Sequence, residues 1–501
     1  RMMPPDGKKA GMHRRNKDRS WNIMRLRSLL RETKLTREER SWAMYDWANS
    51  VYATIIITAI FPIYFTDTVA ATGRAGDATG TSIATACMAV LAPVFGSLAD
   101  FRGMKKRLLV IFMLIGVCFT LTMAVFDSWQ LMLLGFIISY IGYALGNLFY
   151  DGFLTDVTTP ERMDMVSAKG YAYGYIGGST IPFVFALLLI VFSGQMHLNN
   201  TITIKLCILL TSFWWGLFSL PLLRNVRQKH FIETKPGEGL VRAGFRNLRH
   251  TARDIVRDRP LRMFLLAYFF YIDGVNTVIK MATSYGTTLG LGTVGMVGAL
   301  MVTQLVAVPC SVAFAHVSRQ HGTRTALLFG AAVYFIVCLL GFYMGFSLEN
   351  AETAAAAAAL EGGQAAYDAI YQPALARSQR LFWLLSFLVG TSQGGMQALS
   401  RSQFGRMIPP QRSNEFFGFF DVFGKFAAVL GPFLYALVVT TSGRSSLGVL
   451  SLSLLFATGM LLLLLTPKSA FQNQKPLSAA PMPAADAVAG TAPGAAAPGQ
   501  K

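Results

Sequence analysis

Asp46-Trp47-Ala48-Asn49-Ser50, in the first long apolar segment, returns 227 residues later as Asp273-Gly274-Val275-Asn276-Thr277 in another apolar segment. In both copies the acid and the amide stand three residues apart, so each pair projects from one face of a helix. Two membrane halves of the same design are typical of secondary transporters. The sequence therefore predicts one helical unit built twice.

Two further matches extend the repeat. Gly96 to Lys105 pairs weakly with Ala315 to Arg324 at an offset of 219 residues, and Pro160 to Leu187 pairs with Pro410 to Leu437 at an offset of 250. The elements keep the same order in both halves, which predicts parallel repeats related by an axis along the membrane normal. The offsets differ by 31 residues, so the Ala-rich stretch 347–378 is the expected insertion.

The composition requires a membrane. Hydrophobic residues make up 53% of the 501 residues and charged residues 14%, with a mean hydropathy of +0.44. Runs of about 20 apolar residues are long enough to cross a hydrocarbon core. The chain has twelve such runs, near 42–65, 80–99, 107–126, 131–150, 168–192, 202–223, 263–285, 293–315, 325–346, 381–400, 416–440 and 447–466. They predict an all-α membrane protein of two six-helix bundles related by pseudo-twofold symmetry.

Basic residues predict the orientation. Residues 1–40 carry 13 basic and 5 acidic side chains, and residues 224–262 carry 11 and 4. The positive-inside rule places both segments in the cytoplasm, and twelve crossings then place both termini there. The net charge of +19 needs no nucleic acid as a partner, since the basic segments would face anionic lipid at the bilayer.

Five regions follow from these patterns. They are a basic cytoplasmic tail (1–35), an N-terminal six-helix bundle (36–223), a basic central loop (224–260), a C-terminal six-helix bundle with the outer insertion (261–467) and a disordered cytoplasmic tail (468–501). Thr36-Arg37-Glu38-Glu39 predicts a capping box that opens the first helix. Within the insertion, Asn350 to Gly362 predicts a short separate helix with an Asn start and a Gly stop.

Polar groups inside the apolar runs are the candidates for a binding site, because a carboxylate in a span is costly unless it faces a cavity or a partner. The candidates for substrate or proton binding are Asp46, Asn49, Asp273, Asn276, Lys169 and Lys425. Structural alternatives stay open: each Asp could fix its helix to a neighbour, Asp46 could be hydrated at the rim, and Lys425 could pair with Asp421 one turn away. No catalytic cluster or metal-ligand spacing is present in the sequence. Residues 290–295 formally match the dinucleotide-binding pattern, but they join two apolar helices and follow no strand, so we interpret them as a turn with close helix packing and expect no cofactor.

Charges of opposite sign occupy matched positions of the two halves. Asp151 aligns with Arg401, Asp156 with Arg406 and Asp100 with Arg319. These pairs predict a cytoplasmic gate that closes when the halves meet. Each charge could instead cap its own helix or follow the inside-positive bias, and the loop of Asp100 could contact the eleventh helix rather than Arg319. Gly174 and Pro182, with their mates Gly424 and Pro432, predict matched flexible points in the fifth and eleventh helices.

The segment from Gly96 to Lys105 resembles the signature loop of the major facilitator superfamily. The resemblance rests on Gly96, Asp100, Arg102, Gly103 and Lys105, while Phe101 and Met104 stand where basic residues are usual. Longer stretches narrow the resemblance to the vacuole-effluxer-like branch, whose fungal members are described as amino-acid exporters. These stretches are 42–50, 167–178, 400–402, 415–418 and 424–425, and Asp151 stands where that branch is expected to have Asn. The resemblance implies the twelve-helix major facilitator fold and solute efflux.

The sequence therefore predicts a secondary active or facilitative transporter that moves a small polar solute, such as an amino acid, by alternating access and as an effluxer. An intramembrane enzyme would need a nucleophile, base or metal cluster, and the sequence shows none. A receptor or scaffold on the same fold stays as the alternative. Proton coupling through Asp46 or Asp273 is left open. The expected location is the plasma membrane of a prokaryote or the vacuolar membrane of a fungus.

Overall fold

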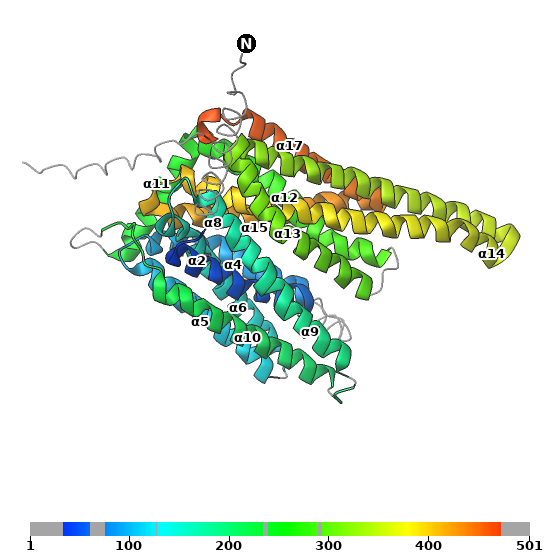
Figure 1. Cartoon of the computed structure of the whole chain (residues 1–501), viewed down its shortest axis with the longest axis horizontal. Coiled ribbons are helices and arrows are strands. Elements are labelled where there is room, and N and C mark those ends of the chain that lie inside the picture. Colours follow the sequence, from blue (N-terminus) through cyan, green and yellow to red (C-terminus); the bar gives the residue numbers. More distant parts are fainter. Residues whose placement is uncertain are drawn as a thin grey trace, which may run out of the picture.

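The computed structural model describes residues 34–60, 76–126, 128–193, 195–197, 199–233, 239–288 and 293–471. Within these ranges the chain is helical apart from turns and one isolated β-bridge between Phe101 and Ile232. Figure 1 shows most helices running side by side along the long axis of the molecule. The predicted tails lie outside the described residues up to residue 33 and from residue 472 on.

The first half contains six membrane segments. Its elements are α2 (Arg37–Val51), η1 (Tyr52–Ile60), α4 (Gly76–Ala99), α5 (Met104–Val125), α6 (Trp129–Gly152), α7 (Leu154–Val157), α8 (Met163–Tyr173), η3 (Gly174–Thr180), α9 (Ile181–Phe192) and α10 (Asn200–Asn225). Thr36 Oγ1 accepts a bond from the amide of Glu39 at 3.2 Å, and Glu39 Oε2 accepts one from the amide of Thr36 at 2.8 Å. These bonds confirm the predicted capping box at the start of α2.

The second half repeats this order after a connecting helix. Its elements are α11 (Leu240–Arg257), α12 (Arg259–Thr288), α13 (Thr293–His321), α14 (Thr323–Met407), η4 (Pro410–Arg412), α15 (Ser413–Ser442), α16 (Ser445–Ser451), α17 (Ser453–Leu465) and η5 (Lys468–Phe471). The connecting helix is α11. The segments from α12 to α17 form the second bundle.

Nine of the described helices are long and apolar enough to cross a membrane. One of them, α14, turns back at Gly363 and supplies two crossings. Two more crossings come from α4, whose apolar part is Ile83–Ala99, and from the continuous helix formed by α2 and η1. The described residues thus contain the twelve predicted crossings.

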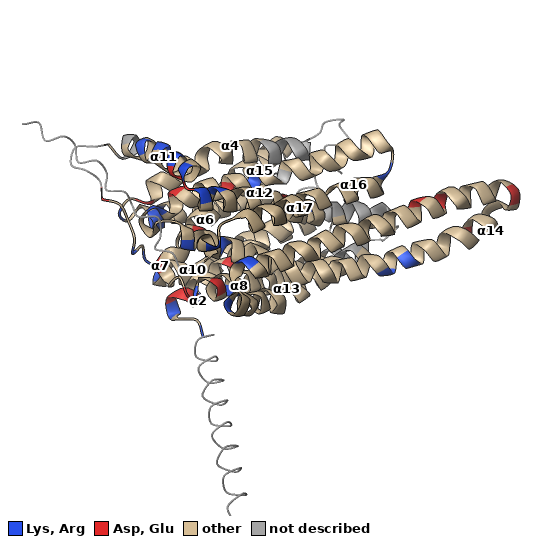
Figure 2. Ribbon diagram, turned by 90° about the horizontal axis from the view of Figure 1, so that it is seen from above, with Lys and Arg blue, Asp and Glu red and all other residues tan. Residues whose placement is uncertain are grey.

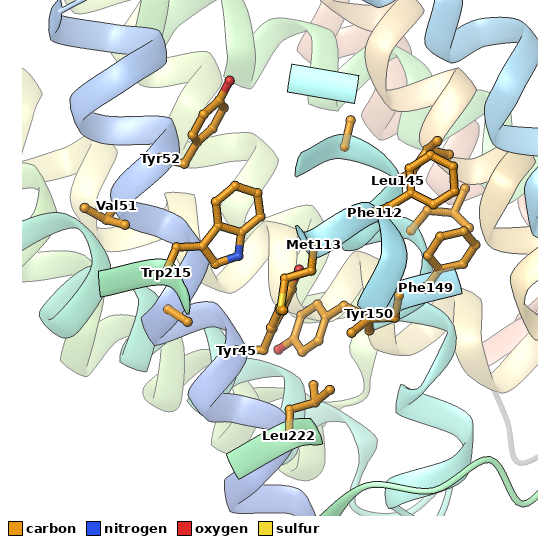
Figure 3. Close-up of a cluster of buried hydrophobic side chains, with 14 of the residues drawn as sticks. Tyr45, Val51, Tyr52, Phe112, Met113, Leu145, Phe149, Tyr150, Trp215 and Leu222 are labelled. Carbon is orange, nitrogen blue, oxygen red and sulfur yellow. The ribbon is translucent and has the colours of Figure 1, made fainter. Parts of the chain in front are cut away.

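Close helix packing builds the core of the first half. A Cβ added to Gly116 of α5 would lie 2.2 Å from the Trp215 ring of α10, so only glycine lets these helices approach this closely. Figure 3 shows Trp215 beside Tyr45 and Tyr52 of α2 and η1, with Tyr150 of α6 next to Tyr45. The rings of Tyr45 and Tyr150 lie 5.1 Å apart. This fully buried aromatic cluster holds α2 against α6, and both helices carry candidate site residues.

The outer insertion differs from the sequence-based expectation. The chain stays helical through Asn350, so the separate helix predicted to begin there is wrong. The break falls at Gly363, which has φ 67°, and the two arms of α14 run back along each other (Figure 1). Met344 and Leu348 pack with Phe382 in one buried cluster. Alanine favours helix, and each arm gives the other a packing surface, so the membrane helices continue into the insertion.

The central loop also contains more structure than its charge pattern predicts. α11 buries Ala243, Asn247, Thr251 and Ile255, which stand four residues apart on one helix face. This face packs on α4, α12 and α15. The start of the predicted disordered tail is ordered too, because Gln403 Nε2 donates to the carbonyl of Ala470 in η5 at 2.7 Å.

One end of the bundle is basic. The turns at residues 100–103, 158–162, 226–233, 319–322 and 408–412 meet there, together with α11, and this region is called the basic end below. Figure 2 shows Lys and Arg gathered around α11, α7 and the start of α2. The opposite end carries the α14 hairpin. The positive-inside rule predicts that the basic end faces the cytoplasm.

Candidate functional site

A cavity of about 1110 Å³ lies between the two halves. Its first wall comes from α2, η1, α6, α8, η3 and α9, and its second wall comes from α12, α13, α14, α15 and α16. The lining extends as far as Thr58 and Ala282, which are both exposed. Such a volume accommodates a small organic molecule.

Most of the polar lining of the first wall surrounds Asp46 and Asn49. Asp46 Oδ2 accepts a hydrogen bond from the Tyr150 hydroxyl at 2.7 Å. One turn further along α2, Asn49 donates from Nδ2 to Oδ1 of Asn147 on α6. All four residues line the cavity. The spacing of Asp46 and Asn49 on one helix face therefore places both beside the junction of the halves.

Arg401 closes the basic end of this cavity. It comes from the second half, on α14, and its side chain is only 3% exposed. Its Nη1 lies 2.9 Å from Oδ1 of Asp151, and its Nη2 lies 3.3 Å from Oδ2 of Asp46. Its Nε also donates to Ser167 Oγ at 2.9 Å. Every one of these acceptors belongs to the first half, so Arg401 ties the two halves together.

Three aromatic rings complete the surroundings of Arg401. Its guanidinium carbon lies 4.8 Å from the ring centroid of Trp42, 4.5 Å from that of Tyr171 and 5.4 Å from that of Tyr150. Cation–π attraction strengthens when the cation is removed from water. The three rings and the two carboxylates of the first half thus form a binding site for one arginine side chain of the second half. The arginine lock, as we use the name below, consists of Arg401, the carboxylates of Asp46 and Asp151, and the rings of Trp42, Tyr150 and Tyr171.

The second wall carries its own charged pair. Lys425 Nζ and Asp421 Oδ2 form the i, i+4 ion pair on α15 that the sequence allowed, and both residues line the cavity. Asn276 of α12 lines it as well. Lys169 of α8 is not part of the described lining and is half-buried outside the cavity. The structure therefore brings Lys425 and Asn276 to the junction but not Lys169.

Asp273 departs from the expectation of a matched site. It is fully buried in the second half and is absent from the described cavity lining, although Asn276 is present there. Its Oδ1 would lie 3.1 Å from a Cβ added to Gly431 of α15, which shows that the carboxyl packs against that glycine. The prediction that Asp273 borders the cavity is therefore wrong. The close packing of α12 on α15 turns this carboxyl into the bundle.

The expected pairing of Asp100 with Arg319 is also wrong. Both oxygens of Asp100 instead accept bonds from the first turn of α15: from the amide and Nδ2 of Asn414 and from the amide of Glu415, each at 2.9 Å. A helix N-terminus offers unpaired amides and a positive dipole end to a carboxylate. Arg319 is exposed. The acid therefore closes the contact between α4 and α15, not a contact with its repeat mate.

Asp156 binds Lys105 of its own half and the segment that follows α10. Its Oδ2 lies 2.7 Å from Nζ of Lys105, and both side chains are fully buried. Its Oδ1 accepts bonds from the amides of Lys229 and His230 at 2.9 and 2.8 Å. This carboxylate anchors the segment after α10 beneath the signature loop. The expected partner, Arg406, is therefore not bound to Asp156.

Arg406 binds Asp164, a residue that the sequence analysis missed. The two side chains are 2.8 Å apart, and Asp164 also accepts bonds from Ser402 and from Ser318, the latter at 2.7 Å. Asp164 begins α8 in the first half, while its three partners belong to the second. The repeat could have identified it, because the residue 250 positions later is Asn414. Asp164 holds the start of α8 to the second half, and Asn414 holds the start of α15 to the first half.

The other signature-loop residues are structural in this conformation. Gly103 has φ 74°, a left-handed value that favours glycine, and forms the turn into α5. A Cβ on Gly96 would lie 2.5 Å from the carbonyl oxygen of Asn414, so α4 and α15 touch there. Arg102 is exposed and lies 3.6 Å from Glu233. The loop thus combines a tight turn with a contact between the halves.

The candidate hinges are not equivalent. Gly174 begins the π-helical segment η3, and Pro182 lies in the first turn of α9 directly after it. In the second half, α15 remains α-helical through Gly424 and Pro432. A π-helical segment often marks a functional site because it interrupts the regular hydrogen bonds of a helix. The irregularity therefore falls in one half only, next to Asp46 and Ser50.

Comparison with known proteins identifies the class to which this arrangement belongs. Residues 78–475 match the family model described as "Vacuole effluxer Atg22 like". A solved structure of the major facilitator superfamily transporter FucP in the outward conformation superposes with a TM-score of 0.59 and 13% identity, covering 87% of this chain and 99% of that chain. The likeness confirms the predicted major facilitator fold.

The sequence relatives agree with this result. The "Uncharacterized MFS-type transporter YxiO" of Bacillus subtilis strain 168 is 38% identical over 460 residues, which cover 89% of this chain and 99% of that protein. Autophagy-related protein 22 of Eremothecium gossypii is 24% identical over 297 residues, about half of its own length. The chain belongs to the vacuole effluxer Atg22-like family. It is an integral, multi-pass membrane transporter of the major facilitator type.

Proposed function

We propose that this protein exports a small zwitterionic solute, an amino acid in the first instance, by alternating access through the cavity between its halves. The observation that carries the proposal is the presence of both charge signs around one cavity. Asp46 and Asp151 stand on the first wall, and Lys425 stands on the second. A solute with an ammonium and a carboxylate group could bridge these walls. The efflux direction rests on the description of the family as vacuole effluxers.

The arginine lock supports the conformational part of the proposal. Arg401 satisfies Asp46 and Asp151 only while the two halves meet at the basic end. The cavity lining meanwhile reaches the exposed residues Thr58 and Ala282 away from that end. This arrangement corresponds to a state that is closed toward the cytoplasm and open outward. Opening the basic end would free Asp46, and its carboxylate could then bind the ammonium group of a cytoplasmic solute.

Asp273 is our candidate for coupling transport to protons. Among the described residues, its Oδ2 is buried and has no hydrogen-bond partner. A lone carboxylate charge inside a membrane span is costly, whereas a carboxyl that takes up a proton avoids that cost. Asn276, one turn away, lines the cavity. Proton binding at Asp273 could therefore alter the cavity wall without contact with the solute.

The test is transport by purified protein in liposomes, measured with a panel of labelled amino acids with and without a pH gradient. We expect at least one amino acid to be transported, and Asp46→Asn to reduce this transport by more than tenfold. Glu352→Gln, on the exposed part of the α14 hairpin, removes the same charge and should transport normally. If folded wild-type protein binds and moves no panel member, the amino-acid assignment fails, and the solute of this transporter belongs to another chemical class.

Asp273→Asn separates coupling from solute binding. We expect the variant to keep binding the solute and to lose the stimulation of transport by a pH gradient. An unchanged response to the gradient would remove Asp273 from the coupling mechanism.

A further inference from the structure

A second pocket, which shares no lining residue with the cavity between the halves, lies at the basic end of the first half. Its volume is about 740 Å³, and it is lined by the first two turns of α5 and the segment after α10. The lining residues are Arg102, Gly103, Lys106, Arg107, Val110, Ile111, Arg227, Gln228 and Phe231. Four of these nine are basic and none is acidic. The transport mechanism proposed above uses none of them.

The pocket gathers positive charge that the described residues balance poorly. Arg107 and Arg227 have exposed side chains. Lys106 donates from Nζ to the carbonyl of Val226 at 2.9 Å, which fixes the amine without neutralising it. Glu233 approaches only Arg102, at 3.6 Å and with both side chains more than 70% exposed. An exposed pair of this kind contributes little. The pocket is therefore suited to an anion.

The side of the pocket that α5 forms indicates which kind of anion binds there. From the pocket outward, exposed apolar side chains follow one stripe of α5 at alternating spacings of three and four residues. They are Ile111 (49% exposed), Leu114 (48%), Leu121 (43%) and Val125 (63%), with exposed Cys118 between them. Such a stripe on a membrane-spanning helix faces the lipid tails. Arg107 stands one turn before Ile111 on the same stripe, at the level where the hydrocarbon region ends.

We propose that this pocket binds the phosphate of an anionic phospholipid, whose acyl chains lie along the α5 stripe from Ile111 onward. Arginine and lysine side chains bind phosphate oxygens through charge-assisted hydrogen bonds, and basic pockets on the cytoplasmic side of membrane helices suit lipid headgroups. The proposal needs both features of the pocket. A soluble phosphate would use the basic residues but not the apolar stripe.

Occupancy would have a structural consequence. The headgroup would touch α5 through Arg107 and the segment after α10 through Arg227. That segment is already fixed to the signature loop, because the amide of Ile232 donates to the carbonyl of Asp100 at 2.8 Å. A bound lipid would thus hold the connection between the halves against the first bundle.

The test measures which lipids the full-length protein retains. Protein purified from vesicles of equal parts phosphatidylglycerol and phosphatidylcholine is analysed by native mass spectrometry. We expect wild type to retain the anionic lipid preferentially, and Arg107→Gln/Arg227→Gln to lose about 25-fold of this preference, because each basic side chain near an anionic surface contributes roughly fivefold in binding. Arg249→Gln/Arg253→Gln is the matched control, since both side chains are exposed on α11 and the charge loss is equal.

Three results would overturn the proposal. Equal retention by wild type and the pocket variant would show that the pocket does not bind the lipid. Equal losses in both double variants would show an effect of net charge alone. A thermal stabilisation by millimolar inorganic phosphate as large as that by phosphatidylglycerol, and lost in the pocket variant, would assign the pocket to a soluble phosphate instead. Lipid preference lost in the pocket variant alone, without a response to phosphate, supports the lipid assignment.

Discussion

Replacing Arg401 by Met should open the protein toward the cytoplasm. Arg401 is only 3% exposed, and the two carboxylates that it binds are 13% and 26% exposed. Removing one partner of a buried ion pair costs about 3–5 kcal/mol, because the remaining charge stays buried without a counterion. Asp151 retains some access to water, so we take the low end, about 3 kcal/mol. Since 1.4 kcal/mol corresponds to a factor of ten, the ratio of inward-open to closed protein, which is small while the lock is intact, should rise on the order of 100-fold.

The assay uses a cysteine at Ala168, in a background without the five natural cysteines. Ala168 is fully buried and packs with Ala315 and Ala398 of the second half, so its labelling reports separation of the halves at the basic end. Arg401→Met should raise the rate of labelling by a water-soluble maleimide by about the factor derived above. Arg377→Met, on the exposed outer hairpin, is the control and should leave the rate unchanged. A wild-type labelling rate in folded Arg401→Met protein would refute the lock.

Three further predictions use the same contacts. Burial raises the pKa of Asp100 to about 6, although the charge of Lys105 and the amides of Asn414 and Glu415 lower this pKa. The closed state therefore takes up a proton at Asp100 more readily than an open state in which this carboxyl has its ordinary pKa. That stabilisation is complete below the ordinary pKa and is lost as the pH rises through 6. The rate of Ala168→Cys labelling, divided at each pH by the rate of the same cysteine in unfolded protein to remove the change in thiolate fraction, should therefore slow up to about tenfold between pH 7 and pH 5, and Asp100→Asn should remove this remaining dependence. Arg406→Asp should speed the labelling, and Arg406→Asp/Asp164→Arg should restore it in part; equal rates in both would leave the Arg406–Asp164 pair without a gating role. Gly174→Leu should abolish transport, because a Cβ there would lie 2.6 Å from Ser50 Oγ, whereas Gly216→Leu, whose nearest contact is at 3.7 Å, should be tolerated; normal turnover in Gly174→Leu would show that the glycine only aids packing.

The hydrophobic runs and the repeat predicted the fold because both depend on periodic patterns that one sequence carries. A run of about 20 apolar residues has few structures open to it in a membrane. The ends of the insertion helix were harder to predict. Asn350 is a good helix start in isolation, but the surrounding helix has no need to stop there, since its two arms pack on each other. That packing is a tertiary effect and leaves no local signal.

The candidate site was predicted in part, for a similar reason. The repeat alignment placed Arg401 opposite Asp151, and these side chains touch. The alignment relates equivalent positions, however, and equivalent positions need not meet across the junction. Asp100 binds the start of α15, and Asp164 binds residues at the end of α13 and on α14. A contact of the Asp100 loop with the eleventh helix, which is α15, was left open by the sequence, whereas the contact of Asp164 depends on how the halves meet and leaves no local signal. The turn of Asp273 away from the cavity depends on the packing of Gly431 and was not visible in the sequence.

Alternating access around the arginine lock is the central claim, and two distances measured in the same protein test it most directly. One pair of spin labels, at Glu161 and His321, spans the basic end, and a second pair, at Thr58 and Ala282, spans the cavity toward the other end; all four positions are exposed. Pulsed electron paramagnetic resonance then compares wild type with Arg401→Met in lipid nanodiscs. The distance between Glu161 and His321 should lengthen in the variant, while the distance between Thr58 and Ala282 shortens. Two unchanged distances, or two that lengthen together, would contradict alternating access controlled by Arg401.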